Sequence, residues 1–66
     1  MNFEGRYYCR NGKMVSVLPV GGVDGIKWTG IEYDSMVEVY YDGNGLARLG
    51  KGMEWDLMER ENPQHG

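Results

Sequence analysis

The placement of glycine constrains this chain more than any other feature. Eleven of its 66 residues are glycine, and between them lie short runs in which apolar residues recur at every second position. Glycine disfavours helix, and a period of two is typical of a strand with one buried face. The sequence therefore predicts an all-β fold of five to six short antiparallel strands, arranged as a meander or a small SH3-like barrel. The expected strands cover residues 5–10, 13–18, 26–33, 36–41, 46–49 and 54–61.

The length of the chain allows a single small β domain, expected over residues 1–61, with a flexible polar tail over 62–66. A domain of this size buries only about 60% of the surface of its unfolded chain, so it usually needs a disulfide, a metal or a partner. Cys9 is the only cysteine, and Cys9 and His65 are the only soft metal ligands. We therefore expect no disulfide within the chain and no metal site, and we expect self-association instead.

Net charge and hydropathy limit the classes of partner that we expect for this chain. Seven Lys and Arg against ten Asp and Glu give a net charge of −3, which opposes binding to phosphate backbones. No apolar run approaches the ~20 residues of a membrane span, and no basic leader precedes an apolar run. We expect a cytoplasmic protein that binds itself or another protein and has no membrane association, and the charge disfavours nucleic acid as a partner.

The turn signal at Asn11-Gly12 indicates how the two strands of the first hairpin pair. A three-residue loop over 10–12, with Gly12 left-handed in a bulge, pairs Tyr7 with Val15 and turns Cys9 inward. A strict two-residue turn would instead set an arginine opposite a valine, which mixes charge with the apolar set. We therefore expect the bulged register.

The frame Tyr-Tyr-x-x-Asn-Gly occurs twice, at residues 7–12 and 40–45. Any tight hairpin selects Asn-Gly and strand tyrosines. The residues that flank the two frames diverge, so we favour convergence on turn chemistry over duplication of a half-barrel.

A second turn, expected at Asp34-Ser35, divides the 26–41 hairpin into two faces. The face expected in the core carries Ile26, Trp28, Gly30, Glu32, Val37, Val39 and Tyr41. The opposite face is too apolar for a plain solvated surface, and we expect it to contact a protein. Its interface candidates are Ile31, Tyr33, Met36, Glu38 and Tyr40.

Groups that could carry chemistry are sparse. Acids gather along the second hairpin and its exit, at Glu32, Asp34, Glu38 and Asp42. Acids at strand ends and turns are normally solvated or shape the turn, and the spacing of a calcium loop is missing. Cys9 lacks the neighbouring histidine or helix start that would lower the pKa of a nucleophilic thiol. We therefore predict no catalytic residue, no cofactor and no metal.

The environment of Glu32 and the conformation of the segment 53–59 are less clearly indicated by the sequence. The register points Glu32 inward, where a carboxylate would need a partner such as Arg6, Arg10 or Lys27. The segment 53–59 alternates apolar residues with acids, which predicts a closing strand but is compatible with one helical turn.

Three stretches follow one another along the chain: Tyr-Tyr-Cys-Arg-Asn-Gly-Lys-Met-Val-Ser-Val-Leu at 7–18, Tyr-Tyr-Asp-Gly at 40–43 and Trp-Asp-Leu-Met at 55–58. Their order resembles a diffuse set of small proteins from phages and mobile genetic elements. Asn11 stands where that set has Asp, and the second glycine after Asn44 departs from its pattern. The resemblance implies a small β fold and an origin such as a phage or an integron cassette. It implies no activity and no catalytic residue.

Together these observations favour a non-enzymatic module that oligomerises or docks another protein. One alternative is a minimal enzyme or small-ligand binder with its site at an oligomer interface, by fold-level analogy with the plasmid-borne type II dihydrofolate reductases. Another is single-stranded nucleic-acid binding on exposed tyrosines, which the net charge opposes.

Overall fold

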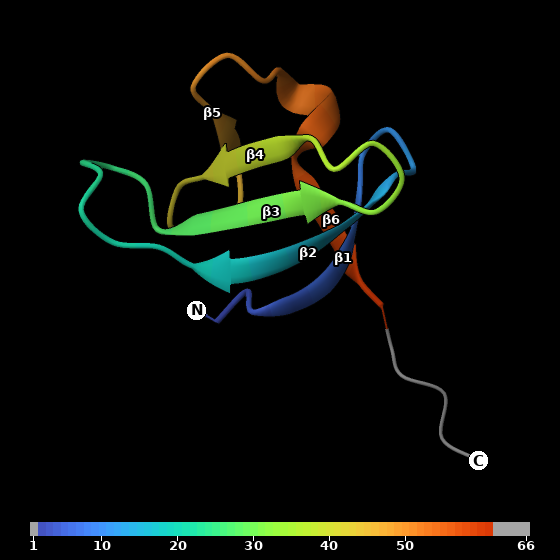
Figure 1. Cartoon of the computed structure of the whole chain (residues 1–66), viewed down its shortest axis with the longest axis horizontal. Helices are drawn as coiled ribbons and strands as arrows, with labels where there is room; N and C mark the ends of the chain where they lie inside the picture. Colours follow the sequence, from blue (N-terminus) through green and yellow to red (C-terminus); the bar gives the residue numbers. More distant parts are fainter. Residues whose placement is uncertain (1, 62–66) are drawn as a thin grey trace.

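The structure is a computed structural model that describes residues 2–61, and these form one curled antiparallel sheet of six strands (Figure 1). The strands are β1 (Gly5–Cys9), β2 (Met14–Pro19), β3 (Trp28–Glu32), β4 (Glu38–Tyr41), β5 (Ala47–Arg48) and β6 (Leu57–Arg60). Their order across the sheet is β5-β4-β3-β2-β1-β6, so β1 to β5 form a meander and β6 returns beside β1. The predicted all-β fold is confirmed, as a half-barrel. The predicted tail over 62–66 lies outside the described residues.

The first hairpin has the predicted bulged register. Tyr7 lies opposite Val15, Gly12 takes a φ of 84°, and the Gly12 amide donates to the carbonyl of Cys9 at 2.9 Å. The β4–β5 turn repeats this loop, because the Gly45 amide donates to the Asp42 carbonyl at 3.1 Å and Gly45 has a φ of 80°. The shared frame therefore adopts one loop conformation twice.

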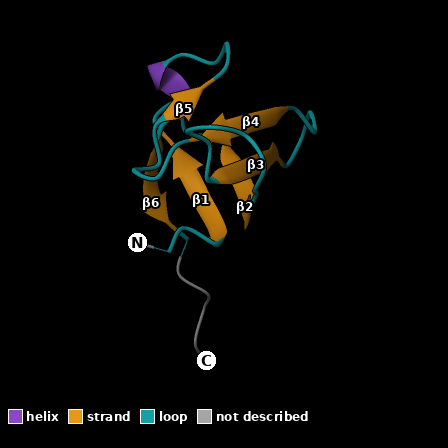
Figure 2. Ribbon diagram, turned by 90° about the vertical axis from the view of Figure 1, so that its left-hand side faces the viewer, coloured by secondary structure: helices purple, strands orange, loops and turns teal. Residues whose placement is uncertain are grey.

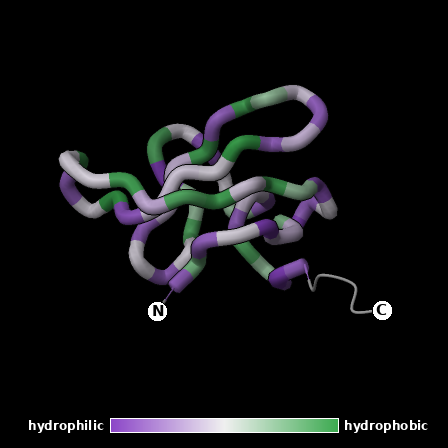
Figure 3. The backbone as a smooth tube through the Cα atoms, turned by 60° about the horizontal axis from the view of Figure 1, so that its bottom comes forward, coloured by the Kyte–Doolittle hydropathy of each residue, from purple (hydrophilic) through white to green (hydrophobic). Residues whose placement is uncertain are grey.

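The second hairpin also has the predicted register. Trp28 lies opposite Tyr41 and Gly30 opposite Val39. The Glu32 amide donates to the Val37 carbonyl at 2.9 Å, which leaves residues 33–36 as the connecting loop. Burial alternates along β1, where Tyr7 and Cys9 are buried and Arg6 and Tyr8 are exposed, as a sheet with one buried face requires. Figure 3 shows hydrophobic and hydrophilic segments interspersed along the chain.

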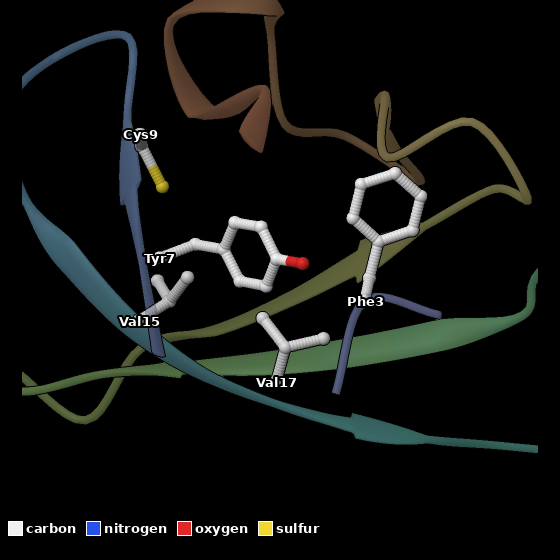
Figure 4. Close-up of a cluster of buried hydrophobic side chains, with 5 residues drawn as sticks. All are labelled: Phe3, Tyr7, Cys9, Val15 and Val17. Carbon is white, nitrogen blue, oxygen red and sulfur yellow. The ribbon is translucent and has the colours of Figure 1, made fainter. Parts of the chain in front are cut away.

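The core lies on the concave side of the sheet. One cluster consists of Phe3, Tyr7, Cys9, Val15 and Val17 (Figure 4). Val39 and Tyr41 are also fully buried, on β4. Phe3 precedes the first strand, and its ring contacts Trp28 edge to face at a centroid distance of 6.0 Å. The inward faces of both hairpins thus form the core, as the pattern indicates.

The segment before β6 departs from the expected strand over 54–61. Met53–Trp55 form a short 3-10 helix, and only Leu57–Arg60 pair with β1. The hydrogen bond that defines this 3-10 turn runs from the Trp55 amide to the Gly52 carbonyl, at 3.0 Å. Figure 2 shows β6 beside β1 and the helix next to β5. No helix within residues 2–61 is long and apolar enough to cross a membrane.

Candidate protein-contact face

The outer side of β2 and β3 carries a shallow apolar depression of about 420 Å³. Leu18 and Tyr33 are about half exposed there, and Met36 is 68% exposed. The lining residues are Ser16, Leu18, Ile31, Glu32, Tyr33 and Met36. Exposed apolar side chains gathered around one hollow are typical of protein-contact surfaces. We call this outer surface of β2, β3 and β4 the contact face.

The structure brings three of the five predicted interface residues to this depression. Ile31, Tyr33 and Met36 line it. Glu38 lies opposite Ile31 on the neighbouring strand β4, outside the lining, and accepts a hydrogen bond from the Thr29 hydroxyl at 3.4 Å. Tyr40 lies beyond Glu38 on the same face and is half-buried, and a hydrogen bond to Glu38 raises the pKa of its hydroxyl.

Leu18 is not among the predicted interface residues, although it is half exposed in the depression. Its spacing from Met14 and Ser16 carried the signal, because residues two apart on a strand share a face. The predicted register turns Val15 inward, so it turns Met14, Ser16 and Leu18 outward.

A charged rim borders the apolar depression. The Arg6 guanidinium donates to the Tyr33 hydroxyl at 3.0 Å and pairs with the Glu61 carboxylate at 3.0 Å. This rim surrounds a second hollow of about 390 Å³ that shares Ser16, Leu18 and Tyr33 with the first. An apolar centre beside a polar rim is the usual anatomy of a protein interface.

Glu32 is buried and its carboxylate is saturated by the loop that follows it. It accepts hydrogen bonds from the Ser35 hydroxyl at 2.6 Å, the Ser35 amide at 2.7 Å and the Asp34 amide at 3.0 Å. These donors lower the pKa of Glu32 to about 2. The expectation of an Arg6, Arg10 or Lys27 partner is wrong, because neutral donors of the turn satisfy the charge. An ionised, fully bonded carboxylate is a structural group and cannot serve as a general acid near neutral pH.

The buried thiol of Cys9 also has a structural environment. Its Sγ lies 3.5 Å from the Tyr41 hydroxyl, which donates to the Trp55 carbonyl at 2.9 Å. Burial raises the pKa of Cys9, and burial likewise raises the pKa of Tyr41. Both groups are therefore protonated at neutral pH, so the thiol is not an activated nucleophile.

The acids of the second hairpin do not converge. Burial alone would raise the pKa of Asp42, but hydrogen bonds from the Leu46 amide and the Arg48 guanidinium lower it overall. The Asp42–Arg48 ion pair has a separation of 2.8 Å. Within the part of the chain that the structure describes, no three His, Cys, Asp or Glu side chains are grouped as metal ligands.

Asp56 is a buried acid that the sequence did not single out. Its Oδ1 accepts the amide of Ala47 on β5 at 2.8 Å, while the next residue, Leu57, donates its amide to the Gly45 carbonyl at 3.0 Å. Asp56 therefore ties together the two edges of the curled sheet. No local pattern could have revealed this role, since it depends on where β5 and β6 meet.

No protein-family model matches the chain, and no curated protein and no solved structure matches it with statistical significance. The resemblance to small phage and mobile-element proteins therefore stays a prediction. Function has to be inferred from the geometry of the contact face and the state of the buried polar groups.

Proposed function

We propose that this protein is a small non-enzymatic module that acts by contacting another protein chain through its contact face. The observation that carries the proposal is the apolar depression lined by Leu18, Ile31, Tyr33 and Met36 on the outer side of the sheet. The core of this half-barrel is already filled from the inner side. The outer apolar side chains therefore contribute little to the fold of one chain, and a partner would bury them.

The polar groups support the same conclusion. Glu32, Cys9 and Asp42 are held by hydrogen bonds that stabilise turns and the core. A catalytic acid, base or nucleophile needs a lone pair or a proton that is free to reach a substrate. In these three residues, hydrogen bonds within the protein already occupy those positions. Binding is thus favoured over catalysis.

We further propose a cytoplasmic location and an origin in a mobile genetic element. The unpaired, buried thiol of Cys9 fits a reducing compartment. The mobile-element origin depends on the resemblance of the three sequence stretches alone.

A photo-crosslinking amino acid at Met36 tests the contact function in the cell that makes the protein. Met53 provides a matched control, because both methionines are 68% exposed and Met53 lies in the 3-10 helix. We expect a discrete crosslinked product from position 36 that is lost when Leu18→Lys is added, and none from position 53. No product at position 36, or equal products at both positions, would refute the proposal.

A further inference from the structure

One row of side chains runs from the neighbouring strand β1 across the contact face to β4. The register sets Arg6 opposite Ser16, Ser16 opposite Ile31, and Ile31 opposite Glu38. Residues directly opposite one another on neighbouring strands share a face, and strands lie about 4.8 Å apart. The row therefore has a positive end and a negative end, about 14 Å apart measured along the curled sheet, with a small residue and a branched apolar residue between them.

This row is self-complementary. A two-fold axis that lies between two facing sheets and runs along the strands, between β2 and β3, reverses the row. It sets Arg6 against Glu38 of a second copy and Ile31 against Ser16 of that copy. Both contacts occur twice, as in any isologous interface. We infer that the partner on the contact face is a second copy of this chain in this orientation, an inference that depends on the proposed contact function.

The neighbouring rows agree with the same axis. Leu18 lies opposite Thr29, so the axis sets Leu18 against the Thr29 of the second copy. The Tyr33 amide donates to the Met14 carbonyl at 3.0 Å, so Tyr33 lies opposite Met14 on the neighbouring strand. The axis therefore sets Tyr33 against the Met14 of the second copy. Mainly apolar side chains, Met14 and Tyr33, then meet on one side of the charged row, and Leu18 packs against the small side chain of Thr29 on the other.

Charge decides between this orientation and its alternative. A two-fold axis that runs across the strands would set Arg6 against Arg6 and Glu38 against Glu38. Like charges placed face to face disfavour association, whereas opposite charges fix the orientation of partners. A guanidinium has five N–H donors, and Arg6 remains about half exposed while it contacts Tyr33 and Glu61. It can therefore accept a further carboxylate from the second copy.

Charge reversal tests the inference directly. Arg6→Glu and Glu38→Arg, each studied alone, place two pairs of like charges in the symmetric dimer. We expect each to raise the dimer dissociation constant about tenfold or more. In an equimolar mixture of the two variants, each substituted position faces a residue of opposite charge, so the mixed dimer should recover wild-type affinity. Because mixing changes neither chain, recovery reports the contact and not the folding of either variant.

Glu38→Arg also separates the effect of the row from the effect of net charge. It reduces the net negative charge of −3, which by itself would favour association of two copies, so weaker dimerisation must come from the row. Asp24→Arg, in the exposed loop after β2, makes the same change of net charge away from the row and should not weaken the dimer. Analytical ultracentrifugation of the single variants, the mixture and this control measures all four dissociation constants.

Three results would overturn the inference. The first is a pair of single variants that dimerise like the wild type, and the second is a mixture that associates no better than its components. The third is a wild-type chain that stays monomeric while position 36 crosslinks a different protein, which would exclude a second copy as the partner. That last result would leave the contact function standing, so the two proposals fail separately.

Discussion

The Ser35 hydroxyl lies 2.6 Å from Oε1 of Glu32 and donates a hydrogen bond to it, three residues along the chain. The Ser35 amide donates to the same oxygen at 2.7 Å. One serine thus supplies two of the donors that allow a carboxylate to remain ionised in a buried position at the end of β3. This contact holds the loop that carries Tyr33 and Met36 onto the contact face.

The Glu32 contacts make stability depend on acid pH. The pKa of Glu32 falls from its ordinary 4.5 to about 2 on folding, so its contribution is complete above about pH 4.5 and is lost as the pH falls toward 2. The melting temperature should therefore drop by several degrees between pH 5 and pH 2. Ser35→Ala should melt lower than the wild type at pH 7 and lose less stability on acidification. Thermal unfolding followed by circular dichroism checks this, and an unchanged pH slope in Ser35→Ala would count against it.

Gly30 should not tolerate a side chain. A Cβ at this position would lie 3.0 Å from Cε2 of Tyr41 and 3.2 Å from Cβ of Val15, both fully buried. Gly30→Ala should therefore cost about 1–3 kcal/mol of unfolding free energy through overpacking. Gly21→Ala is the matched control, since nothing lies within 4 Å of its Cβ. Urea denaturation of both variants measures the difference, and equal stability would show that the core at Gly30 is looser than described.

The bridge made by Asp56 should control the edges of the sheet. Asp56→Ala removes the acceptor of the Ala47 amide and should cost about 1–3 kcal/mol. Asp56→Asn keeps an oxygen acceptor and should cost less. Hydrogen exchange resolved at single amides should show faster exchange at Ala47 and Leu57 in Asp56→Ala, while amides of β3 exchange slowly. Uniform acceleration over the whole sheet would mean that Asp56 acts on global stability and not on this edge.

Local patterns were enough to predict most of the fold. Alternation gave the inward faces, and the left-handed glycine at position 12 gave the register of the first hairpin, since a one-residue slip would have turned an arginine inward. The same reasoning placed Ile31, Tyr33 and Met36 on one outer face. Five of the observed strands are shorter than expected, whereas β2 keeps its expected length and is shifted by one residue, to Met14–Pro19.

What the sequence did not reveal depends on contacts that no side-chain pattern records. The donors to Glu32 are mainly backbone amides of its own turn, and a search for basic partners could not find them. Asp56 acts only where β5 meets β6, and Phe3 is buried although it lies outside every strand. The 3-10 helix at Met53–Trp55 interrupts a pattern that alternates like a strand.

Assembly through the contact face should respond to one exposed side chain. Met36→Lys places a charge beside the apolar depression and should weaken self-association about tenfold or more, because burying the ammonium is costly. Met53→Lys, with the same exposure in the wild type, should have no effect. Equal effects of the two substitutions would point to net charge and not to the face.

The most direct test of the account is the solution mass of the wild-type chain across a dilution series, measured by light scattering after size exclusion. We expect a species of twice the 7.5 kDa monomer mass at high concentration, which dissociates to monomer on dilution, and earlier dissociation in Met36→Lys. A mass of one chain at every concentration would contradict the proposed dimer.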